Sequence, residues 1–395
     1  MQRRVVITGA GTVNPLAQTV AGTFAAMAAG HCAIGPLQIR DVDRLQVQIG
    51  AQVRAWDDSR FGRDLVLYDR FTQFTLVAAA EAVAQARPDH DPTRMGVIFG
   101  TAGGGLTTTD DSFRAVYAEG KNRVHPFTVP RLMPSAPASH VAMRYGAQGP
   151  VFSVSSACAS ANHAMGLALQ MIRAGLADCM LTGGADAMLT FGGMKAWEGL
   201  RVMSPDGCRP FCATRNGMVM GEGAAVFVFE AHAHAVARGA QILAEVAGFG
   251  MTSDASDIVL PNADGAARAM RLAMADAGLS PGDIAYVNAH GTGTAANDRV
   301  EAQVIAQTLS PDVPVSSTKS QHGHLMGGAG AVELLACLLA LQEGVIAPTV
   351  GHRQDDAACA INLVRETGHQ GAVNACLSNA FAFGGLNAVL ALKKA

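Results

Sequence analysis

Aromatic residues and charges of either sign are scarce in this 395-residue chain. Phe, Trp and Tyr together make up 5% of it, and the four charged residue types make up 15%, with a formal net charge of −3. Few aromatic side chains leave little surface for stacking nucleic-acid bases, and a slightly negative chain does not attract phosphate backbones. We therefore expect no nucleic-acid partner.

Paired cysteine motifs are missing as well. The eight cysteines are scattered, no C-x-x-C occurs, and Cys208 and Cys212 lack a second pair of ligands. This pattern is typical of a reducing compartment rather than of a disulfide framework or a zinc site. The N-terminus leads directly into a strand-like segment without a secretory leader. We therefore expect a cytoplasmic protein with no structural metal.

Long apolar runs and two common enzyme motifs are also absent. The longest apolar candidate, 329–341, is interrupted by Glu333, whereas a membrane-spanning helix needs about 20 apolar residues. The glycines at 9–11 lack the third glycine of a dinucleotide-binding turn, and no G-x-S-x-G serine-hydrolase elbow occurs. The sequence thus predicts no membrane span, no nicotinamide site and no serine hydrolase.

The chain is rich in apolar residues and glycine. Hydrophobic residues make up 49% of it, and glycine occurs 44 times. Strand-like runs ending in glycine alternate with apolar helical segments along the whole length. This alternation predicts an α/β fold with mostly parallel sheets and a thick, layered core.

Two distant segments of the chain resemble each other. Laid without gaps, 155–166 and 316–327 match at five of twelve positions, and each follows a β-like run and precedes an apolar helix. A looser pair, 96–105 and 285–294, occurs in the same order. The spacing is too long for a solenoid repeat. We infer two similar α/β halves, 1–240 and 241–395.

Cys158 lies where a buried strand, 151–155, leads into a helix over 159–173. Unpaired backbone N–H groups at a helix N-terminus stabilise a thiolate and can hold an oxyanion. A lowered thiol pKa is therefore expected. The plainer alternative is a small buried hydrophobic residue, as most free cysteines are.

Two histidines and a lysine complete a candidate constellation. His290 follows a strand at 284–288, and His324 lies five residues after Lys319, which matches Cys158 in the repeat. A pseudo-twofold arrangement would bring these groups into one pocket, which suits a nucleophilic cysteine acting on thioesters. Glu333 would be the ionic partner of Lys319.

Simpler interpretations stand beside this one. His163 and His322 are given no role, because a lone histidine on a helix is usually structural. The pair His322 and His324 could suggest a metal, but no third ligand accompanies it. Asp298 and Glu301 have the pattern of a solvated helix start.

Four ordered motifs resemble those of one enzyme family. They are S-S-A-C-A-S, N-A-H-G-T-G-T, S-S-T-K-S-Q-H-G-H and S-N-A-F-A-F-G-G-L-N. Together they are similar to the β-ketoacyl-[acyl-carrier-protein] synthases of the thiolase superfamily, in particular to the elongating type II enzymes. The segment K-A-W-E-G-L-R-V-M-S-P-D-G-C-R-P-F resembles synthases of nodulation-factor and polyene pathways more than housekeeping ones.

The resemblance implies a fold, an assembly and a reaction. It implies a five-layer α-β-α-β-α fold made from two duplicated halves, and a homodimer, with a heterodimer containing a second ketosynthase-like subunit as the other possibility. It implies decarboxylative Claisen condensation of an acyl thioester with malonyl-acyl-carrier-protein. No cofactor is expected beyond the phosphopantetheine arm of the acyl carrier protein.

Roles for individual residues also follow from the resemblance. Cys158 would carry the acyl group, while His290 and His324 would hold the malonyl thioester oxygen. The oxyanion hole would be the N–H groups of Cys158 and Phe383, with Phe383 also gating the pocket. Lys319 and Glu333 would form an ion pair that orders the site, and Asp298 and Glu301 would be supporting acids. Thr292 and Thr294 would bind the pantetheine arm, and Thr109 and Phe381 would line the acyl pocket.

Two alternative functions belong to other classes. A non-catalytic partner of the chain-length-factor type would shape another ketosynthase, but such partners usually lack the cysteine that is present here at Cys158. A thiolase-type acyltransferase would use a second cysteine as its base. The second histidine, His324, favours decarboxylative condensation instead.

Overall fold

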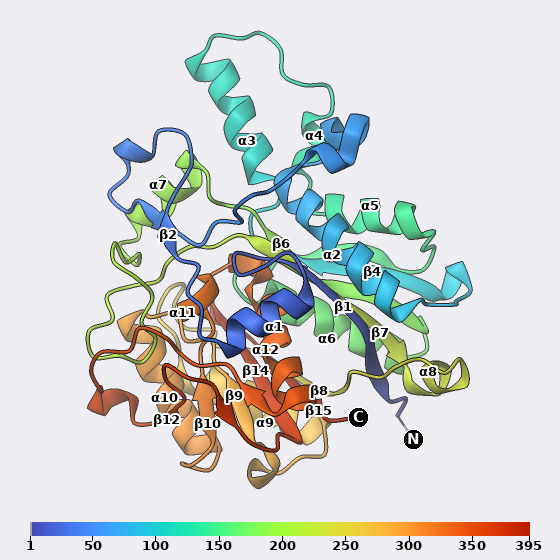
Figure 1. The fold of residues 1–395 in the computed structure, drawn as a ribbon, viewed down its shortest axis with the longest axis vertical. Coiled ribbons are helices and arrows are strands. Elements are labelled where there is room, and N and C mark those ends of the chain that lie inside the picture. Colours follow the sequence, from blue (N-terminus) through green and yellow to red (C-terminus); the bar gives the residue numbers. More distant parts are fainter. Residues whose placement is uncertain (1) are drawn as a thin grey trace.

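The protein is organised around one 11-stranded sheet in a computed structural model that describes residues 2–395 (Figure 1). Across the sheet the strand order is β12-β10-β9-β14-β15-β8-β1-β7-β6-β4-β5. These strands are β1 (Val5–Val13), β4 (Met95–Gly100), β5 (Val151–Val154), β6 (Cys179–Asp186), β7 (Gly223–Ala231), β8 (Ala244–Ser253), β9 (Tyr286–Asn288), β10 (Pro314–Ser316), β12 (Asn362–Leu363), β14 (Ala375–Ala382) and β15 (Leu386–Lys393).

The sheet consists of two five-stranded units with identical topology, plus β12 at one edge. In the order β1-β7-β6-β4-β5, two antiparallel pairings are followed by two parallel ones, and β8-β15-β14-β9-β10 repeats this arrangement. A short antiparallel pairing, Val6 with Glu245 and Ile7 with Ala244, joins the units. The predicted duplication is confirmed, and the boundary predicted at 240 lies between the units.

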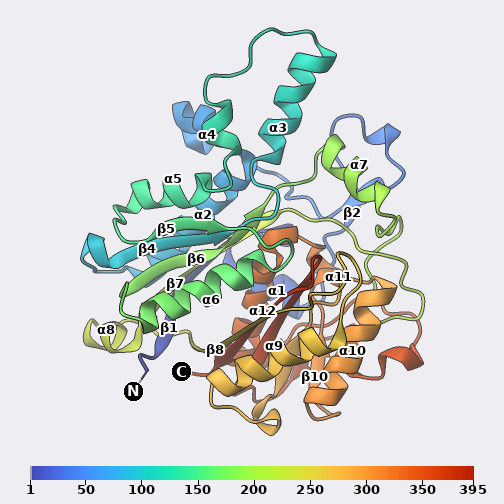
Figure 2. The same ribbon diagram turned by 180° about the vertical axis from the view of Figure 1, so that it is seen from behind.

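Helices form three layers around the two units (Figures 1 and 2). The helices α2 (Arg70–Ala86) and α5 (Ala136–Tyr145) cover the outer face of the first unit, and α9 (Ala263–Asp276), backed by α10 (Ala295–Thr308), covers that of the second. Between the units lie α6 (Ser160–Arg173) and α12 (Ala329–Glu343), each in contact with strands of both. The predicted five-layer α-β-α-β-α fold is therefore confirmed.

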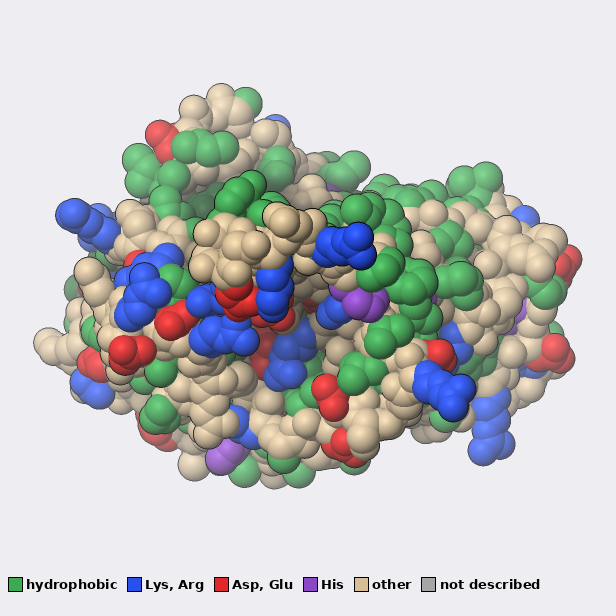
Figure 3. Space-filling model, turned by 90° about the horizontal axis from the view of Figure 1, so that it is seen from above, with side chains coloured by type: hydrophobic (Ala, Val, Ile, Leu, Met, Phe, Trp, Pro, Cys, Tyr) green, Lys and Arg blue, Asp and Glu red, His purple; other side chains and the backbone are tan. Residues whose placement is uncertain are grey.

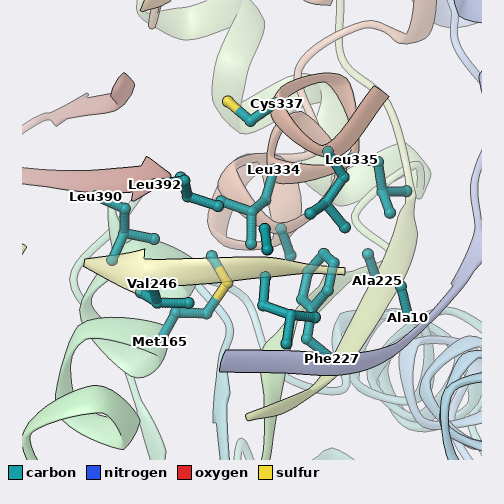
Figure 4. Close-up of a cluster of buried hydrophobic side chains, with 14 of the residues drawn as sticks. Ala10, Met165, Ala225, Phe227, Val246, Leu334, Leu335, Cys337, Leu390 and Leu392 are labelled. Atoms are coloured by element: carbon teal, nitrogen blue, oxygen red, sulfur yellow. The ribbon is translucent and has the colours of Figure 1, made fainter. Parts of the chain in front are cut away.

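The central layer contains the main hydrophobic core. Side chains of both units meet there, including Met165, Phe227, Leu334, Leu335 and Leu390 (Figure 4). The stretch Met326–Glu343 has a mean hydropathy of 1.3 over 18 residues, enough to cross a bilayer by length and composition, but 89% of it is buried inside the fold. The apolar run 329–341 in the sequence is shorter than this stretch, because the stretch also includes the 3-10 turn Met326–Gly328 that precedes the helix. A helix that is apolar on all sides is here a core helix.

Three segments differ from what their sequence patterns favour. Polar residues over 107–127 favour an irregular segment, but it begins with α3 (Leu106–Phe113) and a π-helical turn, η4 (Arg114–Ala118), which protrude at the top of Figure 1. The spacing over 129–145 favours one helix, but that helix is split, because Pro134 forces Met133 into an extended conformation with ψ 132°. The run 218–230 favours a hairpin, but it contains the single strand β7.

The remaining elements are short. The helices are α1 (Val20–Ala28), α4 (Thr128–Leu132), α7 (Phe191–Gly199), α8 (His232–Ala237) and α11 (Lys319–His322). The 3-10 turns are η1 (Val42–Arg44), η2 (Ser59–Leu67), η3 (Pro92–Arg94), η5 (Pro281–Asp283), η6 (Met326–Gly328) and η7 (Ala357–Cys359). Two small ribbons pair β2 (Gly35–Pro36) with β3 (Ile49–Gly50) and β11 (Val345–Ile346) with β13 (His369–Gln370).

The structure also shows that the ungapped alignment of 155–166 with 316–327 does not match equivalent elements throughout. Both copies follow strands at equivalent positions of the two units, β5 and β10, but α6 begins at Ser160, whereas α12 begins only at Ala329. The insertion is α11 together with η6. Lys319 therefore does not lie at the N-terminus of a central helix, as Cys158 does, because α11 adds its own turn in the second half.

Candidate active site

Cys158 lies in a tight turn between β5 and α6. The preceding residue, Ala157, has a left-handed backbone with φ +48°, a conformation that L-residues adopt only when surrounding contacts enforce it. Ser160 supplies such contacts: its hydroxyl donates to the Ala157 carbonyl at 2.6 Å and accepts from the Ser156 N–H at 2.9 Å. The turn presents the sulfur to a cavity while leaving Cys158 only 8% exposed.

The surroundings of Cys158 favour the thiol over the thiolate. Burial raises its pKa to about 12; the positive charge of Lys319 opposes this, and the acids Asp186 and Glu333 add to it. The lowered pKa expected from the helix N-terminus was wrong. The sequence showed the position at a helix start but not the removal of the sulfur from water, which here has the larger effect.

The predicted histidines meet Cys158 at one point. The Cys158 sulfur and one ring nitrogen each of His290 and His324 all lie within 4.8 Å of one another. The two imidazole rings are 5.5 Å apart between centroids and nearly perpendicular, at 85°. His290 follows β9, and His324 lies between α11 and η6. The fold thus joins a thiol from one half with two imidazoles from the other.

The hydrogen bonds of the two rings fix where their hydrogens lie. The Met326 N–H donates to Nδ1 of His324 at 3.2 Å, so the ring hydrogen is on Nε2, which is buried without a partner among the described residues. Nδ1 of His290 lies 3.3 Å from the Lys319 ammonium, which again leaves the hydrogen on Nε2. Burial, and then the charge of Lys319, lowers both pKa values well below the ordinary range. Both imidazoles are therefore neutral hydrogen-bond donors.

Lys319 is fully buried and paired with Glu333, as predicted. Its ammonium also donates to the carbonyl of His290 at 2.6 Å. Burial raises the pKa of Glu333, while Lys319 counteracts that rise. The ion pair thus places a fixed positive charge beside His290 and ties α11 and α12 to the loop after β9.

Asp298 and Glu301 are buried, so their interpretation as a solvated helix start was wrong. The Glu301 carboxylate accepts from the N–H groups of His290 and Gly291 at 2.8 and 2.7 Å. Asp298 accepts from the N–H of Gly293 at 3.2 Å and from that of Phe211 at 2.8 Å. The first two turns of α10 therefore hold the loop after β9 in place.

The cavity above Cys158 collects most of the other predicted residues. Thr292, Thr294, Phe381 and Phe383 line it together with the sulfur and both histidines. The hydroxyls of Thr292 and Thr294 are 2.9 Å apart, and the Phe381 ring lies 6.3 Å from that of His290.

Thr109 lies elsewhere. It is part of α3, its hydroxyl donates to the Gly105 carbonyl at 3.1 Å, and it does not line the cavity. Its place at the pocket floor stays a prediction.

Comparison with known proteins identifies the family. The model of the β-ketoacyl synthase N-terminal domain matches residues 2–235, and that of the C-terminal domain matches residues 243–353. The chain belongs to the β-ketoacyl synthase family. The predicted family is thereby confirmed.

Similar proteins cover the synthase from end to end. It is 45% identical to nodulation protein E of Rhizobium leguminosarum bv. trifolii over 100% of both chains. It is 36% identical to 3-oxoacyl-[acyl-carrier-protein] synthase 2 of Staphylococcus aureus (strain N315) over 99% of this chain and 98% of that one.

Two solved structures are also similar over 100% of both chains. One is the ishigamide ketosynthase/chain length factor, with a TM-score of 0.96 and 32% identity. The other is a type II polyketide acyl-carrier protein in complex with its ketosynthase, AntDE:AntF, with a TM-score of 0.91 and 28% identity.

These likenesses decide between the functions considered from the sequence. They confirm a ketosynthase-type acyltransferase of the nodulation and polyene branch, which condenses carrier-bound acyl groups in fatty acid or specialised acyl chain elongation. They do not favour a non-catalytic partner or a thiolase-type enzyme.

Asp186 is a supporting residue of the synthase that sequence reasoning missed. It ends β6, and its buried carboxylate accepts from the Thr101 hydroxyl at 2.7 Å and from the N–H groups of Ala102 and Gly327 at 2.9 and 2.6 Å. It therefore connects the segment after β4 with the segment after His324, across the two halves. A lone acid at the end of a buried strand was the available signal.

The buried carboxyl of Glu301 gives a testable pH dependence of stability. Burial raises its pKa from 4.5 to about 7. The unfolded chain loses this proton near pH 4.5 and the folded chain near pH 7, so the group should lower the free energy of unfolding as pH rises between these values, by on the order of 3 kcal/mol. Urea unfolding of wild type and Glu301→Gln at pH 5 and pH 7.5 checks this. Equal pH dependence in both proteins would contradict it.

Proposed function

We propose that this synthase is catalytically active, that Cys158 carries the growing acyl chain, and that malonyl-acyl-carrier-protein is the extender. One observation carries the proposal: a single sulfur and two neutral imidazoles lie within 4.8 Å of one another at the wall of a cavity that also contains Thr292 and Phe383. This arrangement suits an acyl-cysteine with a thioester carbonyl polarised beside it.

Loading is a thioester exchange. The Cys158 sulfur attacks the acyl carbonyl, a new carbon–sulfur bond forms, and the carrier thiol leaves with the proton that Cys158 gives up. The backbone N–H groups of Cys158 and Phe383 donate no hydrogen bond to any other described residue, which supports their role as the oxyanion hole.

Condensation follows with the extender bound. The Nε2–H groups of His290 and His324 donate to the malonyl thioester oxygen, so that carbon dioxide leaves and an enolate remains. The positive charge of Lys319 stabilises this developing negative charge. The enolate carbon attacks the acyl-cysteine carbonyl, the β-ketoacyl-carrier forms, and the released thiolate of Cys158 takes up a proton.

No metal or resident cofactor is part of this proposal. Thiolate and imidazole are also ligands that zinc accepts, and Cys158, His290 and His324 are close enough together to form such a set. The proposal assigns the imidazole hydrogens to the thioester oxygen instead. The only prosthetic group that it requires is the phosphopantetheine of the carrier protein, whose arm Thr292 and Thr294 would contact.

The proposed partners are an acyl carrier protein and a second ketosynthase-like subunit, either another copy or a chain length factor. The similar solved structures contain such components. Exposed apolar side chains gather over α3 and η4 and beside α4, including Phe113, Tyr117 and Val129, and Figure 3 shows hydrophobic side chains on this upper face. Large exposed apolar patches are typical of subunit interfaces.

A cytoplasmic location is proposed as well. All eight cysteines are free in the described chain, including the exposed Cys32. Thiols persist in a reducing compartment, where carrier-bound acyl chains would also be available.

Reconstitution tests the function directly. The purified synthase, alone and with its candidate second subunit, should take acyl groups from a panel of acyl-carrier-proteins and then convert malonyl-carrier-protein to β-ketoacyl-carrier-protein and carbon dioxide. Mass spectrometry of both proteins reads each step. Acylation of Cys158 without any ketoacyl product, with the partner present, would contradict the proposal.

A further inference from the structure

Trp197 and Phe383 form an aromatic contact between the two halves at the wall of the active-site cavity. Their rings are 5.9 Å apart between centroids and inclined by 27°, and both line the cavity together with Cys158. Trp197 comes from α7 in the first half, and Phe383 from the turn between β14 and β15 in the second. Neither the loading step nor condensation uses Trp197.

The turn that carries Phe383 is bonded to another segment at the two glycines that follow the phenylalanine. Gly384 and Gly385 have left-handed backbones, with φ +81° and +66°. The Gly384 N–H donates to the carbonyl of Ile258 at 2.8 Å, and the Gly385 carbonyl accepts from the N–H of Asp254 at 2.9 Å. The Phe383 N–H has no such bond among the described residues, and Trp197 is the aromatic neighbour of its ring. The stack on Trp197 is thus the aromatic contact that the Phe383 ring makes among the described residues.

Trp197 is the fixed member of the pair. The side chain of Thr190 caps the N-terminus of α7 by accepting from Gly193. Glu198, beside Trp197, accepts from the N–H groups of Gln46 and Val47 at 2.6 and 2.9 Å. The helix is thus capped at its N-terminus and fastened near its C-terminus to Gln46 and Val47.

We infer that Trp197 is a latch for Phe383: stacking against it holds the Phe383 ring where the ring covers Cys158, and an incoming acyl thioester displaces the ring. This rests on the proposed gating role of Phe383. It agrees with the 8% exposure of Cys158 in the stacked state. Trp197 is a positioning residue, since it acts through Phe383 and not on the reacting atoms.

Alkylation of Cys158 measures the latch without requiring condensation. The rate of iodoacetamide addition, followed by intact mass and located by peptide mapping, should rise about three- to tenfold in Trp197→Ala, which is what loss of one aromatic stack allows. Trp197→Phe keeps a stacking partner and should stay within about twofold of wild type. Trp56→Phe, at the other tryptophan and away from the cavity, is the matched control. A wild-type rate in Trp197→Ala would overturn the inference.

Fluorescence gives a second readout that leaves the latch intact. The chain has two tryptophans, so in Trp56→Phe only Trp197 emits. Acylating Cys158 with octanoyl-carrier-protein should change the intensity of this emission by about a fifth or more, because Phe383 leaves the indole. Full acylation by mass with unchanged emission would overturn the latch. Failure of Cys158 to acylate would instead contradict the proposed function, and the alkylation rates would then decide on the latch.

Discussion

Cys158→Ala is expected to form no acyl adduct with any acyl-carrier-protein and to lose condensation entirely. The sulfur that faces the cavity is the proposed nucleophile, and the two imidazoles near it hold their hydrogens as donors, so neither can replace it. Intact mass after incubation with octanoyl-carrier-protein is the direct measurement. An adduct retained on the variant would place the acyl site elsewhere.

The matched control for this variant is Cys32→Ala. Cys32 is an exposed free thiol that does not line the cavity, so its variant should acylate as wild type does.

Cys158→Ala also separates the two steps, because His290 and His324 are untouched. With malonyl-carrier-protein alone it should still release carbon dioxide, since enolate formation needs only the imidazole donors.

His324→Ala is expected to acylate normally and to lose decarboxylation of malonyl-carrier-protein by about 10²- to 10³-fold, the effect typical of removing one oxyanion donor. Its Nε2–H is a buried donor without a partner in the described structure, and Nδ1 is held by the Met326 N–H. Such a donor awaits an acceptor, which the malonyl thioester oxygen would provide. Carbon dioxide release and intact mass measure the two steps separately.

His322→Gln is the control for local packing. His322 is as buried as His324 and lies two residues before it, but its nitrogens already bond to the Thr318 hydroxyl and the Gly323 carbonyl. Glutamine can keep such bonds, so this variant should decarboxylate within about fivefold of wild type. Equal losses in both variants would show that packing, and not the Nε2–H of His324, supports the reaction.

Buried strands and central helices were the easiest parts of the fold to predict. The runs at β1, β4 and β6 are apolar because both faces of those strands are covered, and α6 shows helical spacing. The exposed helix α3 gave no such signal. Its polar sequence, L-T-T-T-D-D-S-F, buries only Thr108, so no apolar face marked it as a helix.

The site residues likewise divide into those that local motifs identified and those that they missed. Motifs around Cys158, His290 and His324 identified the groups that meet in the structure, and the lone acid in an apolar helix identified the partner of Lys319. Trp197 and Asp186 escaped, because each contributes through a contact with the other half. Such a contact leaves no periodic pattern in the sequence.

The order of residues along the chain was enough to determine the duplicated α/β architecture and to identify the thiol and the two imidazoles that meet in the cavity, since each depends on local patterns and motifs. The protonation of these groups was decided only by the tertiary structure. Burial turned an expected thiolate into a thiol with a pKa of about 12 and kept both imidazoles neutral. The physical reason is that removal from water depends on what the rest of the chain packs around a group, and this outweighs the field of a single helix terminus.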